Sequence, residues 1–231
     1  MTMIRMVVES ASDLELHRKV AALYAHNNAT VYRSLAEGEE KIYAFTLLFP
    51  DEAALETFLA EAPNGPADEL LRHATIDCYI QSSYALIDGV WSPTDAIQDS
   101  RIMWPGNSPV RIVIETACEN NPAMYAMTSE EISQTRAEPG CLQYAWYEDV
   151  DRPGDLLLLE LWDNQVIYDA HWFGRMKTSD YRGDSGRKPS PRQRGEVSRE
   201  FYRHQPFEYH YGRLLPADTA HYSHTVIWGA Q

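Results

Sequence analysis

Cysteine is scarce in this chain. Three cysteines occur among 231 residues, at Cys78, Cys118 and Cys141, and no two of them form a CxxC pair. An odd number without paired spacing argues against a disulfide framework and against a cysteine-ligated zinc site. A reducing compartment, the cytoplasm, is therefore the expected location.

Long apolar runs are also missing. No stretch approaches the roughly 20 apolar residues of a membrane-spanning helix, so no contact with a membrane is expected. The N-terminal residues turn acidic at Glu9, too early for a signal peptide. With 44% hydrophobic and 23% charged residues, the composition is that of a soluble globular protein. The length allows one large domain or two of about 100 residues each.

Basic residues are fewer than acidic ones in this chain. Twenty Lys and Arg residues stand against 34 Asp and Glu residues, a net charge of −14, which argues against nucleic-acid binding. Nine of the twenty basic residues nevertheless lie between Arg175 and Arg203, in a stretch rich in Gly, Pro and Ser. This segment is either a solvated loop or a positively charged lid over an anionic or phenolate-rich ligand.

Motifs for tightly bound nucleotides and for common hydrolases are absent. The chain has no GxGxxG after a strand, no P-loop, no HExxH and no nucleophile elbow. The spacings of four histidines match no known metal site: His204, His210, His221 and His224. We therefore predict neither a metal site nor a tightly bound cofactor.

What the chain does contain is one pattern of elements that occurs twice. Strands are predicted in the first half at 3–9, 29–35, 41–49 and 73–86. One helix follows the capping-box pair Ser12 and Glu15, and a second runs from about residue 50 to a Pro- and Gly-rich stop at 63–66. The order is β-α-β-β-α-β.

The second half repeats this order about 106 residues later. Strands are predicted at 110–118, 141–148, 155–162 and 207–215, with helices at 121–138 and 163–176. The predicted domains are 1–95, a linker at 96–109, and 110–231. The last of these includes a basic insertion at about 177–205 and a tail strand at 221–228.

Each half is thus predicted to be a ferredoxin-like unit of the α+β class, with two helices on one face of a four-stranded antiparallel sheet. Leu156 to Leu159 form an unbroken apolar run, whereas a sheet with one wet face would alternate. The face without helices therefore needs a partner. We expect the two repeats to pack sheet to sheet as a pseudo-dimeric α+β barrel, and the chain to be a monomer or, through its tail, a homodimer.

The second half resembles a known family, the antibiotic biosynthesis monooxygenases, which are dimeric α+β barrels. The resemblance covers about 65 residues, from Val110 to Met176. Four motifs carry it, in the family's order: Thr135-Arg136-Ala137-Glu138-Pro139-Gly140-Cys141-Leu142, then Tyr147-Glu148-Asp149 with Pro153-Gly154, then Leu159-Glu160-Leu161-Trp162, then Tyr168-Asp169-Ala170-His171. The first half lacks the Glu-Pro-Gly turn and any counterpart to Trp162 or His171, so we expect it to be structural.

The tandem layout also looks like the oxygenases that open the B ring of angucycline polyketides. That resemblance implies oxidative C–C cleavage of a polycyclic phenol or quinone by O2. It further implies reduced flavin (FADH2 or FMNH2) as a diffusible co-substrate, supplied by a separate flavin reductase.

Candidate site residues follow from the shared faces of the second half. Tyr144 and Trp146 share one side of a strand, and Glu160 and Trp162 share one side of the next. Three further residues share a helix face: Tyr168, His171 and Trp172. On the preceding helix Tyr125, Thr128, Ile132 and Arg136 approximate one stripe.

We predict that His171 is the acid/base, that Trp162 belongs to the catalytic set, and that Arg136 or an arginine of the lid steadies a phenolate. The predicted substrate-binding residues are Tyr144, Trp146, Glu160, Tyr168, Trp172 and Tyr125. Each also has a structural interpretation: the tryptophans as core, Glu160 as an ion-paired acid, and Arg136 as a charge at a helix C-terminus.

Two alternatives from other functional classes stay open. A polyketide cyclase would use the same barrel and acid/base residues without O2. A non-catalytic binding or resistance protein would sequester an aromatic metabolite. Haem degradation is less favoured, because the bulky Tyr168 and Trp172 flank His171.

Overall fold

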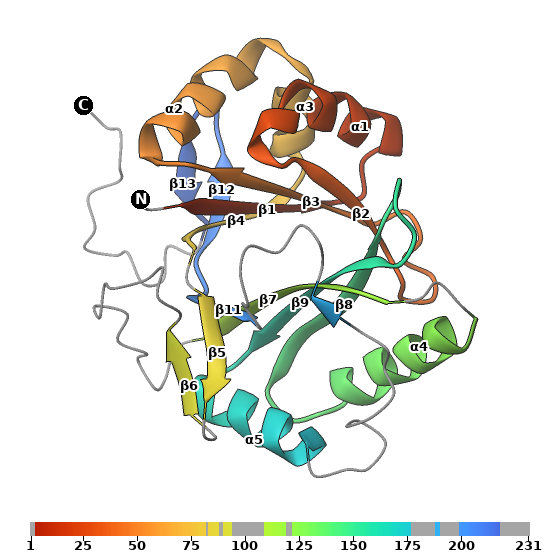
Figure 1. Ribbon diagram of the computed structural model, residues 1–231. Coiled ribbons are helices and arrows are strands. Elements are labelled where there is room, and N and C mark those ends of the chain that lie inside the picture. The colour runs from red at the N-terminus through yellow and green to blue at the C-terminus, as the bar shows by residue number, and fades with distance from the viewer. Residues whose placement is uncertain are drawn as a thin grey trace. The chain divides into compact units, whose positions relative to one another are not determined.

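The computed structural model describes residues 3–81, 83–87, 90–93, 109–118, 122–176, 188–189 and 199–217 (Figure 1). The chain divides into two compact units. The first unit comprises Met1–Arg33, Lys41–Gln81 and Gln205–Gln231, and the second unit comprises Ser34–Glu40 and Ser82–His204. Neither unit is a contiguous segment, whereas the pattern of predicted elements favours the contiguous domains 1–95 and 110–231.

The sheet of the first unit has the ferredoxin-like strand order β4-β1-β3-β2, with every pair antiparallel. The four strands are β1 (Ile4–Ser10), β2 (Thr30–Ser34), β3 (Tyr43–Phe49) and β4 (Thr75–Ile80). A hairpin from much later in the chain extends the sheet beside β4: β12 (Pro206–Tyr209) and β13 (Leu214–Pro216).

The helices of the first unit differ from expectation in two details. Asp13, not Ser12, caps α1 (Leu14–Leu23), because its carboxylate accepts the Glu15 N–H at 3.2 Å. The predicted stop at 63–66 is followed by a further helix, α3 (Pro66–Arg72), whose first residue is a proline that needs no helical N–H partner. Between these helices lie α2 (Glu52–Glu61) and the short 3₁₀ turns Ala25–Asn27 and Ala62–Asn64.

The sheet of the second unit has the equivalent order β8-β9-β7-β11. Its strands are β7 (Val110–Ala117), β8 (Cys141–Asp149), β9 (Asp155–Trp162) and β11 (Arg199–Arg203). The hairpin of β5 (Ser83–Ile87) and β6 (Val90–Pro93) extends it beside β11, and β10 (Lys188–Pro189) pairs with β7. Two helices, α4 (Pro122–Arg136) and α5 (Gln165–Met176), lie on the same side of this sheet (Figure 1).

The predicted closing strand of the second repeat is wrong. Arg199–Arg203 pairs with β7, while the predicted strand at 207–215 is the hairpin that pairs with β4 in the first unit. Likewise, the single strand predicted at 73–86 is two strands, of which β4 belongs to the first unit and β5 to the second. Short alternating segments of similar composition compete for each sheet edge, and only long-range pairing decides between them.

The α+β class with two ferredoxin-like repeats is confirmed, and the sheet-to-sheet packing of the repeats stays a prediction. The tail strand expected at 221–228 and most of the basic insertion, 177–187 and 190–198, lie outside the described residues. No helix in the described part of the chain is long and apolar enough to cross a membrane.

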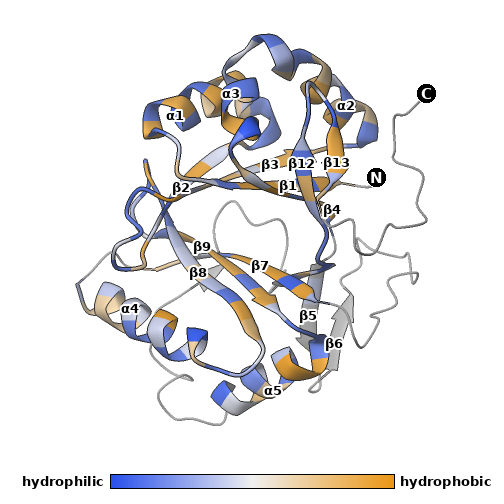
Figure 2. Cartoon of the chain, turned by 180° about the vertical axis from the view of Figure 1, so that it is seen from behind, coloured by the Kyte–Doolittle hydropathy of each residue, from blue (hydrophilic) through white to orange (hydrophobic). Residues whose placement is uncertain are grey.

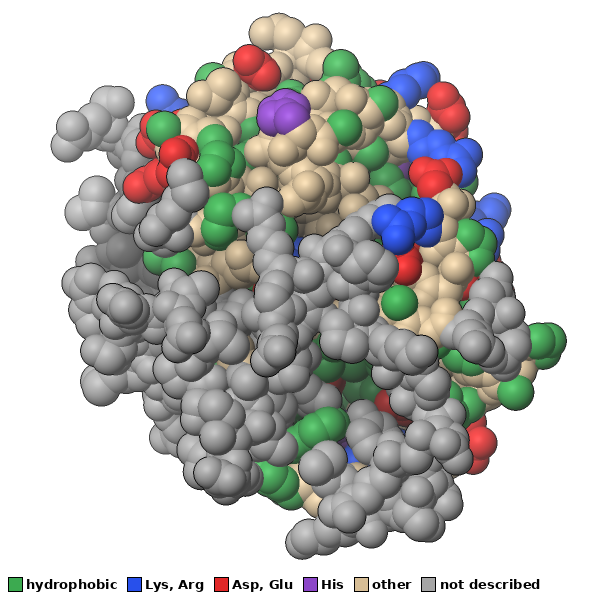
Figure 3. Space-filling view, viewed as in Figure 1, with side chains coloured by type: hydrophobic (Ala, Val, Ile, Leu, Met, Phe, Trp, Pro, Cys, Tyr) green, Lys and Arg blue, Asp and Glu red, His purple; other side chains and the backbone are tan. Residues whose placement is uncertain are grey.

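The strands of both sheets carry buried apolar side chains. Figure 2 shows hydrophobic residues along β9, whose leucines from Leu156 to Leu159 are all buried. On the surface that Figure 3 shows, described acidic and basic side chains lie close to one another, so this part of the described surface presents no broad patch of one sign.

The two repeats also share a polar pattern on the sheet face opposite their helices. In both units four buried side chains occupy matching register positions. These side chains are an arginine in the first strand, a tyrosine opposite it, a carboxylate two residues before that tyrosine, and a second tyrosine in the second strand. They are Arg5, Tyr79, Asp77 and Tyr32 in the first unit, and Arg111, Tyr202, Glu200 and Tyr147 in the second. The helix-facing positions do not match in this way, since Leu47 and Phe49 stand where the second unit has Glu160 and Trp162.

Candidate active site

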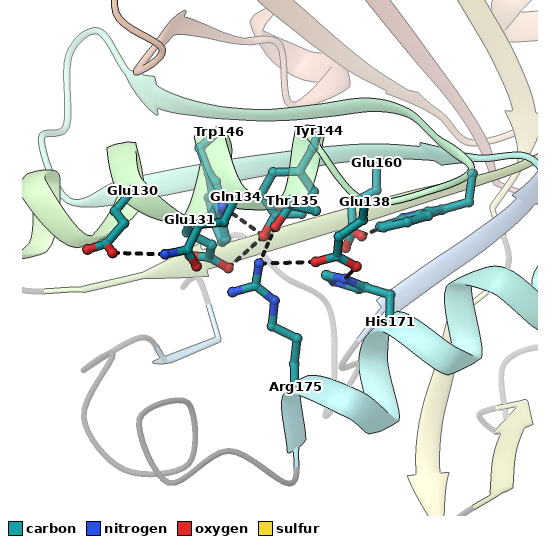
Figure 4. A network of polar contacts seen from close by, with 11 residues as sticks. Glu130, Glu131, Gln134, Thr135, Glu138, Tyr144, Trp146, Glu160, His171 and Arg175 are labelled. Carbon is teal, nitrogen blue, oxygen red and sulfur yellow. Dashed lines mark hydrogen bonds and ion pairs between the residues drawn. The ribbon is translucent and has the colours of Figure 1, made fainter.

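Side chains with acid/base chemistry gather on the helix-facing side of the second unit's sheet (Figure 4). A tight turn between α4 and β8 makes this possible. Gly140 adopts the left-handed region with φ +78°, and a β-carbon there would lie 2.8 Å from the side chain of Ile167 in α5. The turn therefore brings the end of α4, with Glu138, directly against α5.

The centre of this group is a hydrogen-bonded contact between His171 and Glu138. Nδ1 of His171 lies 2.7 Å from Oε2 of Glu138, and the imidazole is only 6% exposed while the carboxylate is 32% exposed. A carboxylate on Nδ1 favours the tautomer that carries its hydrogen there, so Nε2 is the nitrogen left to exchange a proton. This arrangement suits a general base held by a positioning carboxylate.

Arg175 holds the other side of Glu138. Its Nη2 lies 3.3 Å from Oε1 of Glu138 and also donates to Oγ1 of Thr135. Because Arg175 follows His171 by one helical turn on α5, both side chains reach the same carboxylate. Glu138 is thus fixed between a histidine and an arginine, and its position defines that of the imidazole.

Aromatic rings enclose the imidazole. The ring centroid of Trp162 lies 4.5 Å from that of His171, and those of Tyr144 and Tyr168 lie 6.2 Å and 6.4 Å away. All three aromatic side chains are buried. The imidazole therefore lies among aromatic side chains that are themselves shielded from solvent.

Two buried carboxylates lie in the same layer, and each accepts a hydrogen from an aromatic residue. The indole N–H of Trp162 donates to Oε2 of Glu160 at 2.8 Å. The hydroxyl of Tyr144 donates to Oε1 of Glu131 at 2.6 Å and accepts the indole N–H of Trp146 at 3.2 Å.

A free thiol also lies beside this layer. Cys141 stands opposite Trp162 in the β8–β9 pair, and burial, followed by the charges of Glu160 and Glu138, raises its pKa to about 11. The thiol is therefore neutral at physiological pH, which does not suit a nucleophile.

The structure places most of the predicted site residues in or beside this group. His171, Trp162, Tyr144, Glu160, Trp146 and Tyr168 are connected by the contacts above. Trp172 packs against the apolar cluster that contains Trp162 and Tyr168. Their roles in binding and catalysis stay predictions.

Arg136 and Tyr125 lie beside Tyr144, since Tyr125 packs against the apolar cluster that contains Tyr144 and Trp146. Nε of Arg136 donates to the backbone oxygen of Tyr144 at 2.8 Å and its Nη1 pairs with Glu39 at 2.8 Å, which holds the pKa of Glu39 below its ordinary value. Tyr125 donates to Glu148, which also accepts the backbone N–H of Gly154. These contacts connect β8 to its neighbours, and the predicted roles of Arg136 and Tyr125 in catalysis and binding stay predictions.

Sequence reasoning missed four polar members of the group: Glu138, Arg175, Thr135 and Glu131. Glu138 was assigned to the turn alone, although its position just before the Pro-Gly turn is a usable signal. Arg175 was grouped with the basic segment, although its spacing of four from His171 places both on one helix face.

The comparisons with known proteins match a segment of the second half. Residues 115–173 match the family model described as "Antibiotic biosynthesis monooxygenase", which confirms the predicted resemblance over that segment. The segment contains Glu138, His171 and the aromatic residues around them. This segment of the second half is therefore similar to that family.

One curated relative is an uncharacterized protein from Synechocystis sp. that is 36% identical over 47 residues, or 20% of this chain. The chain spans 32% of the length of that relative.

Among solved structures, similar ones include a protein from Lactobacillus acidophilus NCFM proposed to be a monooxygenase (TM-score 0.35, 15% identity, covering 94% of this chain and 100% of that one). Another is an anthrone oxidase-like protein (TM-score 0.30, 10% identity, covering 87% and 90%).

Proposed function

We propose that this protein is an oxygenase that uses O2 to oxidise an electron-rich polycyclic aromatic compound of the polyketide class. One observation carries the proposal. The nearly buried imidazole of His171, bonded to Glu138, is enclosed by aromatic rings, within the segment that matches the monooxygenase family. An acid/base group in an apolar, aromatic surround is what such a reaction requires from the protein.

The first step is deprotonation. Nε2 of His171 takes a phenolic or benzylic proton from the substrate, while Glu138 stabilises the resulting imidazolium through Nδ1. The substrate anion is rich enough in electrons to reduce O2, and the burial of the surrounding rings limits the access of water and therefore side reactions. Trp162 and Tyr144 would stack on the substrate and hold it against the base.

The electron balance separates two outcomes. Oxidation of a ring CH2 group to C=O consumes one O2, releases one H2O, and needs no other reductant. Oxidative C–C cleavage by insertion of one oxygen atom needs two more electrons to reduce the second atom to water. In that case reduced flavin (FADH2 or FMNH2), made by a separate reductase, supplies them as a diffusible co-substrate.

An oxygen-electrode assay tests the proposal. The purified protein is given an anthrone and a panel of polycyclic phenols, with reduced flavin added or withheld, and product mass is followed alongside O2. We expect O2 uptake with a matching mass change, and a fall of about 100-fold or more in His171→Gln, the usual scale of a lost general base.

A matched control is available in the first unit. His210 also pairs with a glutamate, Glu208 at 3.2 Å, but its side chain is 54% exposed. His210→Gln should leave activity unchanged. No O2 uptake under either flavin condition would sink the oxygenase proposal. Turnover without O2 would instead indicate a cyclase, and tight binding without product would indicate a binding protein.

A further inference from the structure

Two easily oxidised side chains in the second unit each donate a hydrogen to a buried carboxylate. Trp162 donates its indole hydrogen to the carboxylate of Glu160 at 2.8 Å, and Tyr144 donates its phenolic hydrogen to the carboxylate of Glu131 at 2.6 Å. All four side chains are buried. An indole or a phenol in a core needs a partner for its hydrogen, but a neutral acceptor meets that need without the cost of burying a negative charge.

Trp146 provides the contrast within the same layer. It is equally buried, yet its indole hydrogen goes to the hydroxyl of Tyr144, a neutral acceptor, at 3.2 Å. The fold can therefore satisfy a buried indole without a carboxylate. In the first unit Leu47 and Phe49 occupy the positions equivalent to Glu160 and Trp162, so the ferredoxin-like fold does not itself require an indole bonded to a carboxylate there.

A buried carboxylate makes the loss of one electron from its aromatic partner easier. Oxidation of an indole or phenol creates a radical cation, which is a far stronger acid than the parent group. In a dry interior that cation is strongly disfavoured. If the hydrogen-bonded carboxylate takes the proton as the electron leaves, a neutral radical and a neutral carboxylic acid remain, and no new charge is buried.

Trp162 and Tyr144 are also both neighbours of the imidazole of His171. Ring centroids separate His171 from Trp162 by 4.5 Å and from Tyr144 by 6.2 Å, and Tyr168 continues from Trp162 at 6.3 Å. An oxidant generated beside His171 would thus lie close to several oxidisable rings.

We propose that Trp162 with Glu160, and Tyr144 with Glu131, are proton-coupled one-electron donors that discharge radical oxidants such as the hydroperoxyl radical. In the step at Trp162, the indole N–H bond breaks, its proton forms an O–H bond on Glu160, and one electron passes to the oxidant. The hydroperoxyl radical becomes the hydroperoxide anion, which takes a proton from solvent as hydrogen peroxide. The step at Tyr144 is the same, with Glu131 as the proton acceptor.

The test uses the full-length protein without any substrate, so its outcome does not depend on the proposed oxygenase activity. The protein is mixed with hexachloroiridate(IV), an outer-sphere one-electron oxidant, then freeze-quenched and examined by EPR. We expect neutral tryptophanyl and tyrosyl radicals. Trp162→Phe should remove most of the tryptophanyl signal, whereas the matched control Trp146→Phe should retain it.

The decisive variants are Glu160→Gln and Glu131→Gln. A glutamine oxygen can still accept the same hydrogen bond and fills the same space, but it cannot take the proton. We expect slower oxidation in both, and for Glu160→Gln a radical with the spectrum of the tryptophan cation. Radical yield and spectra like those of the wild type in both glutamine variants would overturn the proposal, even if Trp162→Phe proved too unstable to study.

Discussion

Gly140 offers a quantitative test of how the candidate active site is held together. Its φ of +78° lies in the left-handed region, and a β-carbon there would lie 2.8 Å from Cδ1 and 2.9 Å from Cγ2 of Ile167. Gly38, in the same unit, has a similar φ of +83° but open space around the equivalent position. Alanine substitutions at Gly38 and Gly140 should therefore cause similar backbone strain, but only the one at Gly140 should also cause a steric clash.

The expected magnitudes follow from these two terms. A left-handed alanine costs about 1–2 kcal/mol, partly offset by about 0.4–1 kcal/mol because alanine has less freedom than glycine in the unfolded chain. Gly38→Ala should therefore lower the free energy of unfolding by about 1 kcal/mol or less. Gly140→Ala adds an overpacking cost of about 1–3 kcal/mol. Ile167 cannot relieve this clash by changing its χ1 rotamer at low cost, since a β-branched side chain in a helix has one strongly preferred rotamer.

Urea unfolding of the two variants measures the difference, with an unchanged slope confirming that only stability has changed. A double-mutant cycle between Gly140→Ala and Ile167→Ala then isolates the contact. We expect the double variant to be more stable than the sum of the single losses predicts, by about the overpacking term of 1–3 kcal/mol.

The reasoning fails if Gly140→Ala costs no more than Gly38→Ala, or if the cycle shows no coupling with Ile167. In that event the contact between this turn and α5 would not be what positions Glu138 against His171.

Three further predictions concern single residues. Burial, followed by the hydrogen bond to Asp68, raises the pKa of Tyr209 to about 12; because the folded state then holds this proton more tightly than the unfolded state, the free energy of unfolding should fall as pH rises from about 10 to about 12. Tyr209→Phe should remove that dependence in urea unfolding, and an identical pH profile would contradict it. A β-carbon on Gly174 in α5 would meet nothing within 4 Å, so Gly174→Ala should raise the free energy of unfolding by about 0.5–1 kcal/mol; a loss of stability would argue against it. Burial raises the pKa of Cys141 to about 11, so iodoacetamide at about pH 8 should alkylate it at least about tenfold more slowly than free cysteine. Mass spectrometry of the modified peptide measures that rate, and a rate equal to that of free cysteine would refute it.

The sequence by itself determined the parts of this protein that depend on near neighbours. The hairpin of β8 and β9 and the helix after Asn164, whose side chain accepts the Ile167 N–H at 3.0 Å, were predicted within a residue or two. So was the placement of Tyr144 with Trp146 and of Glu160 with Trp162 on common strand sides. Periods of 2 and 3.6 residues are local properties of the backbone, and alternation along a strand is enough to reveal them.

Only the tertiary structure decided which of these faces meet, and through which partners. Glu138 lies 33 residues before His171 in the chain, and no periodic pattern links the end of one helix to the face of another. The same limit explains the misassigned closing strand, since β11 and β12 are both short and alternating, and only pairing with distant strands tells them apart. The sequence alone thus identified the imidazole of His171, and the turn at Gly140 determined which carboxylate holds it.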